Sequence, residues 1–348
     1  MAVKNRVTIK SIASELGVSP STVSYVLHGK AREKGYSEET IKKIRQVADK
    51  LGYIPSQWAR SLQQEKSKTI SIVISNLLGG WADEIVKGVV KVLSPQEYTP
   101  IISLYDPISH SRSNGNNEHS HEINSILQRR DESVICQAIP AAGKDYSMLV
   151  RRGVRLVFIG SLPEDVSGFE NTSSVIWDCR PAVKTAIGHL IDGGCRRIAF
   201  VGARHGVQSD MLRFNEYKRT LDEAGISFDE QRVAWAPLYK QVTIEQIGAL
   251  FSGSTGPDAI FAINDAIAVM TLEILQNLGI KVPDDVAVIG MGNLPIVRNK
   301  IINLTTMHEP LEEIGYEAAK IAINHTISTG RPVHKKISCN QLVLRGTA

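Results

Sequence analysis

The sequence of 348 residues predicts an N-terminal all-α head, a short hinge helix and a large α/β body with two open sheets. Two patterns predict this order. Helical periodicity with clear helix caps fills the N-terminal part, whereas from Lys68 onward short Val- and Ile-rich runs alternate with helical stretches. The expected boundaries are 1–55 for the helix-turn-helix head, 56–67 for the hinge helix and linker, and 68–348 for the body.

The head begins with two short helices joined by a tight turn at Gly17-Val18. Thr8 is a good N-cap for the first helix, whose apolar residues recur at helical spacing as far as Leu16. Ser19 caps the second helix, and Pro20 occupies its first position, where a missing N–H has no cost. Such a helix-turn-helix places its second helix in the major groove of DNA.

The second helix carries the side chains best suited to read base edges. Val23, Val26 and Leu27 form its apolar face, and its polar side chains point away from that face. Each base pair presents a distinct pattern of donors, acceptors and methyl groups in the major groove. The candidate DNA-binding residues of the head are Thr8, Ser19, Ser21, Thr22, Ser24, Tyr25 and His28. The alternative is an ordinary helical bundle with a solvated polar face.

A third helix and a hinge complete the N-terminal region. Ser37 caps the third helix, which carries one apolar stripe and ends at Gly52. The hinge, from Ser56 to Gln63, is too short to be a stable helix alone, so we expect it to fold when two copies pair on DNA. Its candidate DNA-binding residues are Ala59, Arg60 and Leu62, with Leu62 as a wedge in the minor groove. The alternative is a passive tether.

The order of these motifs resembles the LacI/GalR family of bacterial transcription regulators, the lactose-repressor/galactose-repressor type. The matching motifs are T-I-x-x-I-A from Thr8 to Ala13, G-V-S-x-x-T-V-S from Gly17 to Ser24, G-Y-x-P from Gly52 to Pro55 and A-R-x-L from Ala59 to Leu62. The resemblance implies a sequence-specific DNA-binding repressor that acts as a homodimer on a pseudo-palindromic operator.

Two features depart from the family pattern. The segment from Lys30 to Gly35 lengthens the usual loop after the second helix, and Trp58 stands where the family has a smaller residue. The longer loop adds Lys30, Arg32 and Lys34, which are placed either to contact DNA phosphates or to form a solvated loop. The sequence leaves both interpretations open.

Charge is unevenly distributed along the chain. The first 67 residues hold 12 Lys and Arg against 6 Asp and Glu, and the remainder holds 28 against 30. A basic module on a near-neutral body is typical of a protein that binds DNA with one part and something else with the other. The start of the chain has no apolar signal segment and no run reaches the length of a membrane span, so we expect a cytoplasmic protein without membrane contact.

The body contains the apolar runs expected of buried parallel strands. They begin at Ile70, Pro100, Ser133, Leu156, Ile198, Ala259 and Val286. Two open sheets account for this number better than one. A polar loop from Asp106 to Glu122 interrupts the pattern; it holds three histidines, but without Cys or carboxylates at ligand spacing we expect no metal. The four cysteines are scattered without a C-x-x-C pair, which indicates reduced structural thiols.

The body resembles the effector domain of the same family, itself similar to periplasmic sugar-binding proteins. The resemblance implies two Rossmann-like lobes with a cleft between them: lobe one is about 68–193 and 308–334, and lobe two is about 194–307 and 335–348. The residues that match cleft positions, or depart from them, are Trp81, Asp178, Arg213, Trp235, Asn264, Asn293 and Glu309. Arg and Asn side chains provide fixed hydrogen bonds and indole rings pack on sugar C–H groups, so a small polar effector such as a sugar or a derivative is expected. Structural alternatives are a core tryptophan for Trp235 and helix caps for Asp178 and Asn264.

The cleft motif also departs from the family. Where G-Y/F-D-D is common, this chain has Gly290-Met291-Gly292-Asn293, and Glu309 replaces a common Gln. These changes leave room for an effector other than a simple neutral sugar, for control by a protein partner, or for no effector. An NAD-dependent enzyme is a remote alternative, because the G-x-G after Ile289 lacks a third glycine and a following amphipathic helix. We therefore expect no enzyme activity and no cofactor.

Overall fold

The computed structural model describes residues 7–53, 67–74, 80–104, 121–138, 143–160, 166, 168–202, 208–236, 241–253, 255–327 and 331–348. The chain divides into two compact units, Met1–Lys68 and Thr69–Ala348. Ala59, Arg60 and Leu62 of the expected hinge, and most of the polar loop that ends at Glu122, lie outside the described residues.

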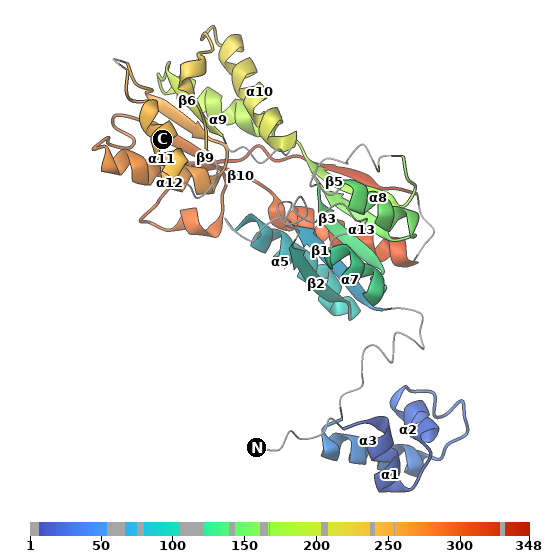
Figure 1. The fold of residues 1–348 in the computed structure, drawn as a ribbon. Helices are drawn as coiled ribbons and strands as arrows, with labels where there is room; N and C mark the ends of the chain where they lie inside the picture. The colour runs from blue at the N-terminus through green and yellow to red at the C-terminus, as the bar shows by residue number, and fades with distance from the viewer. Residues whose placement is uncertain are drawn as a thin grey trace. The chain divides into compact units, whose positions relative to one another are not determined.

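The first unit is a three-helix head made of α1 (Ile9–Leu16), α2 (Pro20–Leu27) and α3 (Glu38–Leu51) (Figure 1). The Thr8, Ser19 and Ser37 side chains accept hydrogen bonds from backbone N–H groups at the three helix starts. Each helix contributes apolar side chains to one small core, whose buried members are Ile12, Ala13, Val23, Val26, Ala31, Ile41, Ile44 and Ala48. The predicted helix-turn-helix is confirmed as a structure.

The first lobe of the body contains a six-stranded parallel sheet in the order β11-β5-β4-β3-β1-β2. Its strands are β1 (Thr69–Ile74), β2 (Thr99–Leu104), β3 (Ser133–Gln137), β4 (Arg155–Ile159), β5 (Thr172–Trp177) and β11 (His334–Ile337). All but the two edge strands are largely buried. Edge strand β2 exposes Ile102 and Leu104, so the expectation of a buried strand after Pro100 was wrong.

Helices cover both faces of this sheet. They are α5 (Trp81–Leu93), followed by the 3₁₀ turn η1 (Ser94–Gln96), then α7 (His121–Arg129), α8 (Gly143–Arg151) and α13 (Leu311–Ile327). The helices α5 and α13 share one hydrophobic cluster, while α7 and α8 share another. Gly88 and Gly315 lie where α5 and α13 meet, and a Cβ at either position would overlap backbone of the other helix. Glycine therefore permits this close helix crossing.

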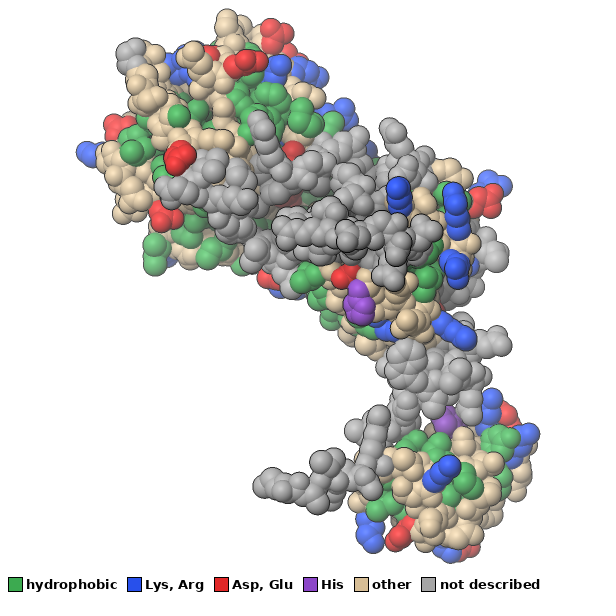
Figure 2. All heavy atoms as spheres, in the orientation of Figure 1, with side chains coloured by type: hydrophobic (Ala, Val, Ile, Leu, Met, Phe, Trp, Pro, Cys, Tyr) green, Lys and Arg blue, Asp and Glu red, His purple; other side chains and the backbone are tan. Residues whose placement is uncertain are grey.

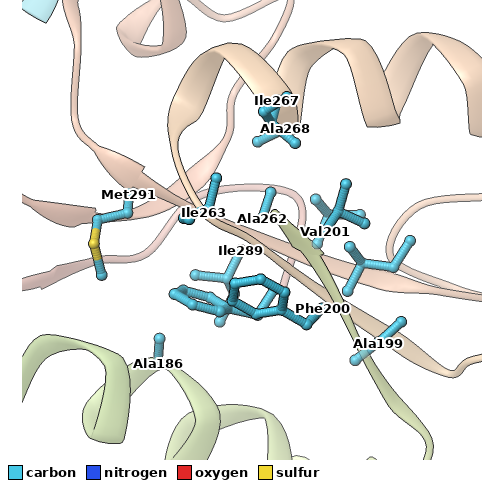
Figure 3. Packing of buried hydrophobic residues seen from close by; sticks show 14 of the residues in the cluster. Ala186, Ala199, Phe200, Val201, Ala262, Ile263, Ile267, Ala268, Ile289 and Met291 are labelled. Carbon is cyan, nitrogen blue, oxygen red and sulfur yellow. The ribbon is translucent and has the colours of Figure 1, made fainter. Parts of the chain in front are cut away.

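The second lobe contains a six-stranded sheet in the order β12-β10-β9-β8-β6-β7. Its strands are β6 (Ile198–Gly202), β7 (Val233–Trp235), β8 (Ala259–Ala262), β9 (Ala287–Gly292), β10 (Thr305–His308) and the antiparallel β12 (Leu342–Val343). Its helices are α9 (Arg180–Asp192), α10 (Gln208–Glu223), η4 (Glu230–Arg232), α11 (Gln241–Ala249), α12 (Asp265–Asn277) and η5 (Pro295–Arg298). Figure 3 shows Ala186 of α9 on one side of the strands and Ile267 and Ala268 of α12 on the other. The two-lobed α/β fold predicted from the sequence is confirmed.

The chain crosses between the lobes at places that differ from two of the three expected ones. Helix α9 packs its buried residues, including Ala182 and Val183, into the second-lobe core, so the first crossing precedes α9 instead of lying near Gly193. Strand β11 pairs with β5 of the first lobe, so the last crossing follows Ile337 instead of lying near His334. The sequence alone could not assign either element to a lobe, because an amphipathic helix such as α9 can cover either sheet and a short strand such as β11 can pair with either sheet.

Within the described part of the chain, no helix is long and apolar enough to cross a membrane, and no group of three His, Cys, Asp or Glu side chains is arranged to hold a metal ion. All four cysteines are free thiols. Cys136 and Cys179 are buried, and burial raises the pKa of both thiols.

Candidate DNA-binding and effector sites

The start of α2 is held by a small hydroxyl cluster. Ser19 Oγ accepts a hydrogen bond from the Thr22 N–H at 3.0 Å, and the two side-chain oxygens lie 2.8 Å apart. Ser19 and Ser21 are exposed, and Thr22 is half-buried. The exposed N-terminal half of α2 therefore presents hydroxyl groups, which act as donor or acceptor and suit base edges or phosphates. Lys and Arg side chains lie at several points of the head surface in the view of Figure 2.

Two of the predicted DNA-binding residues are engaged within the head. Thr8 forms a capping box with Ser11, in which each side chain contacts the other residue's backbone N–H. His28 Nδ1 lies 2.7 Å from the Ser24 carbonyl oxygen, so this nitrogen carries the proton and donates to the carbonyl. His28 Nε2 is buried without a hydrogen-bond partner among the described residues. The His28 ring is therefore hydrogen-bonded to the last turn of α2.

In the body, Arg213 and Glu309 form a buried ion pair. Arg213 Nη2 lies 2.5 Å from Glu309 Oε1, and Arg213 Nη1 donates to the Ile263 carbonyl oxygen at 2.7 Å. Helix α10 supplies the arginine, and the turn between β10 and α13 supplies the carboxylate. Burial raises the pKa of Glu309, and the adjacent guanidinium opposes this shift by favouring the carboxylate. The charge of Arg213 is thus balanced inside the protein.

Trp177, which sequence reasoning missed, lies next to this pair. It ends β5 and packs against the cores of both lobes. Its ring centroid is 5.6 Å from the Arg213 guanidinium carbon. Within the described residues, Trp177 Nε1 and Arg213 Nε are buried donors without hydrogen-bond partners. The one signal in the sequence was its position directly before Asp178 at the end of an apolar run.

Three other predicted effector residues have structural partners. Asp178 is bound by Arg180 through two hydrogen bonds of 2.8 Å and by Lys336 at 2.8 Å, and the Arg180 guanidinium holds the pKa of Asp178 well below its usual range. Asn264 caps α12, accepting from the Ile267 N–H at 2.9 Å. Trp235 packs edge-on against Phe200 and Phe214. The roles of Asn264 and Trp235 are the structural alternatives that the sequence left open, whereas Asp178 is an ion-paired side chain and the N-cap of α9 is Cys179.

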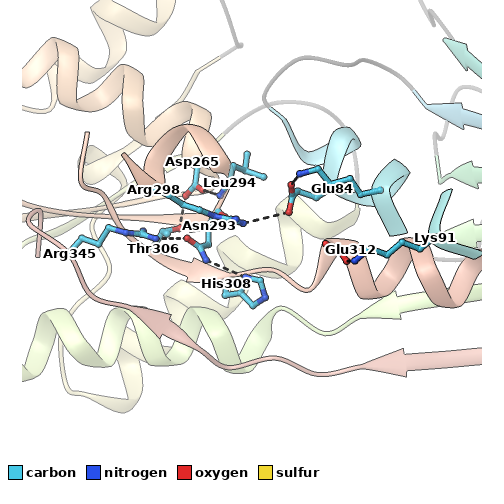
Figure 4. A network of polar contacts seen from close by, with 11 residues as sticks. Glu84, Lys91, Asp265, Asn293, Leu294, Arg298, Thr306, His308, Glu312 and Arg345 are labelled. Atoms are coloured by element: carbon cyan, nitrogen blue, oxygen red, sulfur yellow. Dashed lines mark hydrogen bonds and ion pairs between the residues drawn. The ribbon is translucent and has the colours of Figure 1, made fainter. Parts of the chain in front are cut away.

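The Gly290-Met291-Gly292-Asn293 departure surrounds a buried carboxyl group (Figure 4). Asp265 accepts hydrogen bonds from the Thr306 hydroxyl at 2.5 Å and from the Leu294 N–H at 2.7 Å, and burial raises its pKa to about 6. A Cβ at Gly290 would lie 2.7 Å from Asp265 Oδ1, so glycine permits the approach of the carboxyl group. Asp265 is therefore a buried, hydrogen-bonded carboxyl group beside this motif.

Asn293 is turned toward the C-terminal segment. Its Oδ1 accepts a hydrogen bond from Arg345 Nη2 at 2.7 Å, and its amide nitrogen lies 3.5 Å from His308 Nδ1. Near it, Arg298 of η5 reaches across to Glu84 of α5, 3.6 Å away (Figure 4). This pair joins the second lobe to the first. Trp81 begins the same helix α5 and packs half-buried on the first-lobe core.

Two hollows lie on the second lobe. One, of about 360 Å³, is lined by His189, Gly193, Cys195, Asp258, Asp284 and neighbouring residues. The other, of about 440 Å³, is lined by Ile244, Gly248, Met270, Glu273, Ile274, Asn277 and Leu278. Neither hollow contains any of the predicted effector residues.

Two family models match the chain. Residues 8–56 match the model of bacterial regulatory proteins of the lacI family, and residues 187–348 match that of the periplasmic binding protein-like domain. The head is therefore a LacI-family helix-turn-helix domain, and the second half of the chain contains a periplasmic-binding-protein-like domain. The resemblance inferred from the head motifs is confirmed, and the protein is a DNA-binding transcription regulator.

Relatives align along nearly the whole chain. The HTH-type transcriptional repressor PurR of Vibrio atlanticus is 26% identical over 318 residues, 91% of each chain. Catabolite control protein A of Priestia megaterium is 26% identical over 316 residues, 90% of this chain and 91% of the relative. These relatives are transcription regulators, so the enzyme alternative is not supported.

Solved structures show the same fold. The lac repressor dimer bound to operator and the anti-inducer ONPF has a TM-score of 0.79 at 19% identity, covering 99% of each chain. The complex of the transcriptional regulator CelR with cellobiose has a TM-score of 0.69 at 23% identity, covering 99% of this chain and all of that chain.

Proposed function

We propose that this LacI-family regulator is a homodimeric repressor that binds a pseudo-palindromic operator, and that a small polar effector bound between its lobes changes its operator affinity. The helix-turn-helix supports the first part, since one helix reads only a few base pairs and a two-fold protein requires a two-fold site. A cytoplasmic location, where DNA is accessible, is part of this proposal.

The observation that carries the effector proposal is the pair of buried donors at Trp177 and Arg213. An unpaired buried N–H costs about 1–3 kcal/mol, so a bound molecule that accepts hydrogen bonds from both groups would recover that free energy. Both donors lie where β5 of the first lobe approaches α10 of the second. A ligand held there would contact both lobes.

The ion pair sets the chemical class of the ligand. Glu309 already balances the charge of Arg213, and an anionic ligand would have to compete with that carboxylate. The arrangement therefore favours a neutral molecule rich in acceptor oxygens, which includes sugars and nucleosides. The complex of a relative with cellobiose supports the first of these classes.

The dimer proposal is supported by exposed apolar side chains of the second lobe. Ile244 of α11 and Leu278, directly after α12, are 47% and 51% exposed beside the hollow of about 440 Å³. Soluble proteins rarely expose such groups together unless another surface covers them. The lac repressor, which shares the fold, is a dimer, so a second copy of this chain is the proposed partner.

Titration calorimetry with neutral saccharides, nucleosides and sugar phosphates tests the effector proposal. The molecule that binds should also shift operator affinity, and operator DNA should shift the affinity for that molecule by the same factor.

Arg213→Ala should abolish this response while leaving operator binding without ligand intact. Since this change leaves Glu309 unpaired, Arg213→Ala with Glu309→Gln is the companion variant. A folded double variant that still responds normally would show that the site lies elsewhere, and binding of protein partners alone would favour the protein-controlled alternative.

A further inference from the structure

The segment that lengthens the loop after α2 is folded against the helix end. The Lys30 N–H donates to the Tyr25 carbonyl oxygen at 2.9 Å, and the Tyr36 N–H donates to the Ala31 carbonyl oxygen at 3.1 Å. Ala31 is 3% exposed and belongs to the core of the head. These contacts fix the turn from Lys30 to Gly35 relative to α2, and they bring the next residue, Tyr36, back onto that helix.

Tyr36 contacts two of the predicted base-reading residues. Its ring centroid lies 6.5 Å from that of Tyr25, with 30° between the ring planes, and its hydroxyl lies 3.5 Å from Thr22 Oγ1. Thr22 and Tyr25 are three residues apart and therefore share one face of α2. A single side chain from outside the helix thus limits the positions of both. Tyr36 itself is half-buried and packs on the head core.

The turn also places a cation beside Tyr25. Lys34 Nζ lies 5.4 Å from the Tyr25 ring centroid, within the range of a cation–π contact. Of the three basic residues in the turn, Arg32 pairs with Glu38 at 2.9 Å, whereas Lys30 and Lys34 have no ion pair with the described residues. The Lys34 charge beside Tyr25 is therefore available to a DNA phosphate.

We propose that Tyr36 is a positioning residue for operator recognition and that Lys34 contacts a phosphate beside the bases that Tyr25 reads. The proposal rests on the proposed function of the head as an operator-binding module. Tyr36 fixes the Tyr25 ring and the Thr22 hydroxyl before DNA binds, so the base preference of α2 depends on a residue outside it. The longer loop then extends the DNA-binding surface.

Selection from a pool of random-sequence duplexes by the full-length protein tests this role. Tyr36→Leu keeps apolar bulk but removes the ring, and it should weaken the base preference that Tyr25→Ala also alters, by roughly fivefold to 100-fold in relative affinity. Tyr36→Phe retains the ring beside Tyr25 and removes only the hydroxyl near Thr22, so it should keep the preference that Tyr25→Ala alters and weaken the preference that depends on Thr22. Glu38→Gln, which disturbs the same turn without touching Tyr25, is the matched control and should select the unmodified sequences.

The readouts separate positioning from packing. If Tyr36→Leu lowers the melting temperature but selects the same bases with the same relative affinities, Tyr36 is only a packing residue and the proposal is wrong. If the unmodified protein selects no sequence, the proposed function of the head is wrong, and the roles of Tyr36 and Lys34, which rest on it, are overturned with it.

Lys34 is tested by the salt dependence of binding to the selected duplex. Lys34→Gln should reduce the slope of log affinity against log salt by about 1 and leave the selected bases unchanged. The same substitution at the paired Arg32 is the control and should change the slope less. An unchanged slope for Lys34→Gln would overturn the phosphate contact.

Discussion

At the scale of single residues, Arg213 shows why the proposed effector site differs from the sequence expectation. The sequence pointed to Arg213 and Glu309 separately, but it could not show that they bind each other at 2.5 Å. Their pairing depends on the fold, because α10 and the turn after β10 are about a hundred residues apart in the chain. Because Glu309 neutralises its charge, Arg213 would act on a ligand as a hydrogen-bond donor and not as an unpaired cation.

Glu309→Gln should therefore change ligand preference. The variant keeps an acceptor for Arg213 but frees its charge, so binding of sugar phosphates relative to the neutral parent sugars should increase by roughly tenfold, or about 1.4 kcal/mol. Titration calorimetry on both proteins measures the ratio. An unchanged ratio would mean that Arg213 does not face the ligand.

Asp265 should give the stability of the body a distinct pH dependence. Its pKa is about 6 in the folded protein against 3.8 for an ordinary carboxyl group, because burial favours the protonated form. The stabilising contribution is therefore fully present below about pH 4 and is lost as the pH rises through about 6, with an amplitude of up to about 3 kcal/mol.

Denaturant unfolding of the unmodified protein and of Asp265→Asn at several pH values measures this contribution. The unfolding free energy of the unmodified protein, relative to that of Asp265→Asn, should fall between pH 4 and 6 and level off above that range. A difference that stays constant from pH 4 to 7 would contradict a raised pKa.

At the scale of elements, the sequence predicted best where local rules decide the structure. Thr8, Ser19 and Ser37 cap the three head helices as expected, because a cap needs only its own turn. Strand β5 was missed because its Thr172, Ser173 and Ser174 resemble a loop. The structure buries these hydroxyls with partners such as the Val166 carbonyl oxygen and His334, which a linear sequence does not reveal.

The crossing of α5 and α13 should be sensitive to one methyl group. In Gly88→Ala the new Cβ would overlap the Glu312 carbonyl oxygen, and the backbone there cannot move aside easily. The free energy of unfolding should therefore fall by about 1–3 kcal/mol or more. Gly188→Ala on α9 is the matched control, because nothing lies within 4 Å of its Cβ position. Alanine there should stabilise the helix by about 0.5–1 kcal/mol. Equal melting temperatures for the two variants would show that the crossing is not close-packed.

At the scale of the whole body, one polar contact joins the two lobes at a place where solvent reaches it. Arg298 and Glu84 lie 3.6 Å apart; the arginine side chain is 44% exposed and that of Glu84 is 11% exposed. Solvent around the arginine weakens the attraction between the two charges, so a ligand bound to both lobes can outweigh this contact. The sequence predicted two α/β lobes but misplaced two of the crossings between them, because α9 and β11 could have joined either sheet.

Dimer formation should depend on the apolar surface beside α11 and α12. Leu278→Lys would place a charge in the proposed interface and should raise the dimer dissociation constant roughly tenfold or more. Met211→Lys on α10 introduces the same charge at another side chain, 50% exposed, and should leave the dimer intact. Sedimentation equilibrium measures both, and a Leu278→Lys protein that remains as dimeric as the control would place the interface elsewhere.

The salt dependence of binding to a selected duplex, compared with a scrambled duplex, measures whether the protein recognises DNA by sequence. The selected site should be bound at least about 10³-fold more tightly than the scrambled one, and affinity should fall steeply on a log–log salt plot as phosphate contacts release counterions. Thr22→Ala should reduce the difference in affinity between the two duplexes, because it changes base preference, and should leave the salt slope unchanged. A slope near zero together with equal affinity for both duplexes would show that the protein does not bind DNA by sequence.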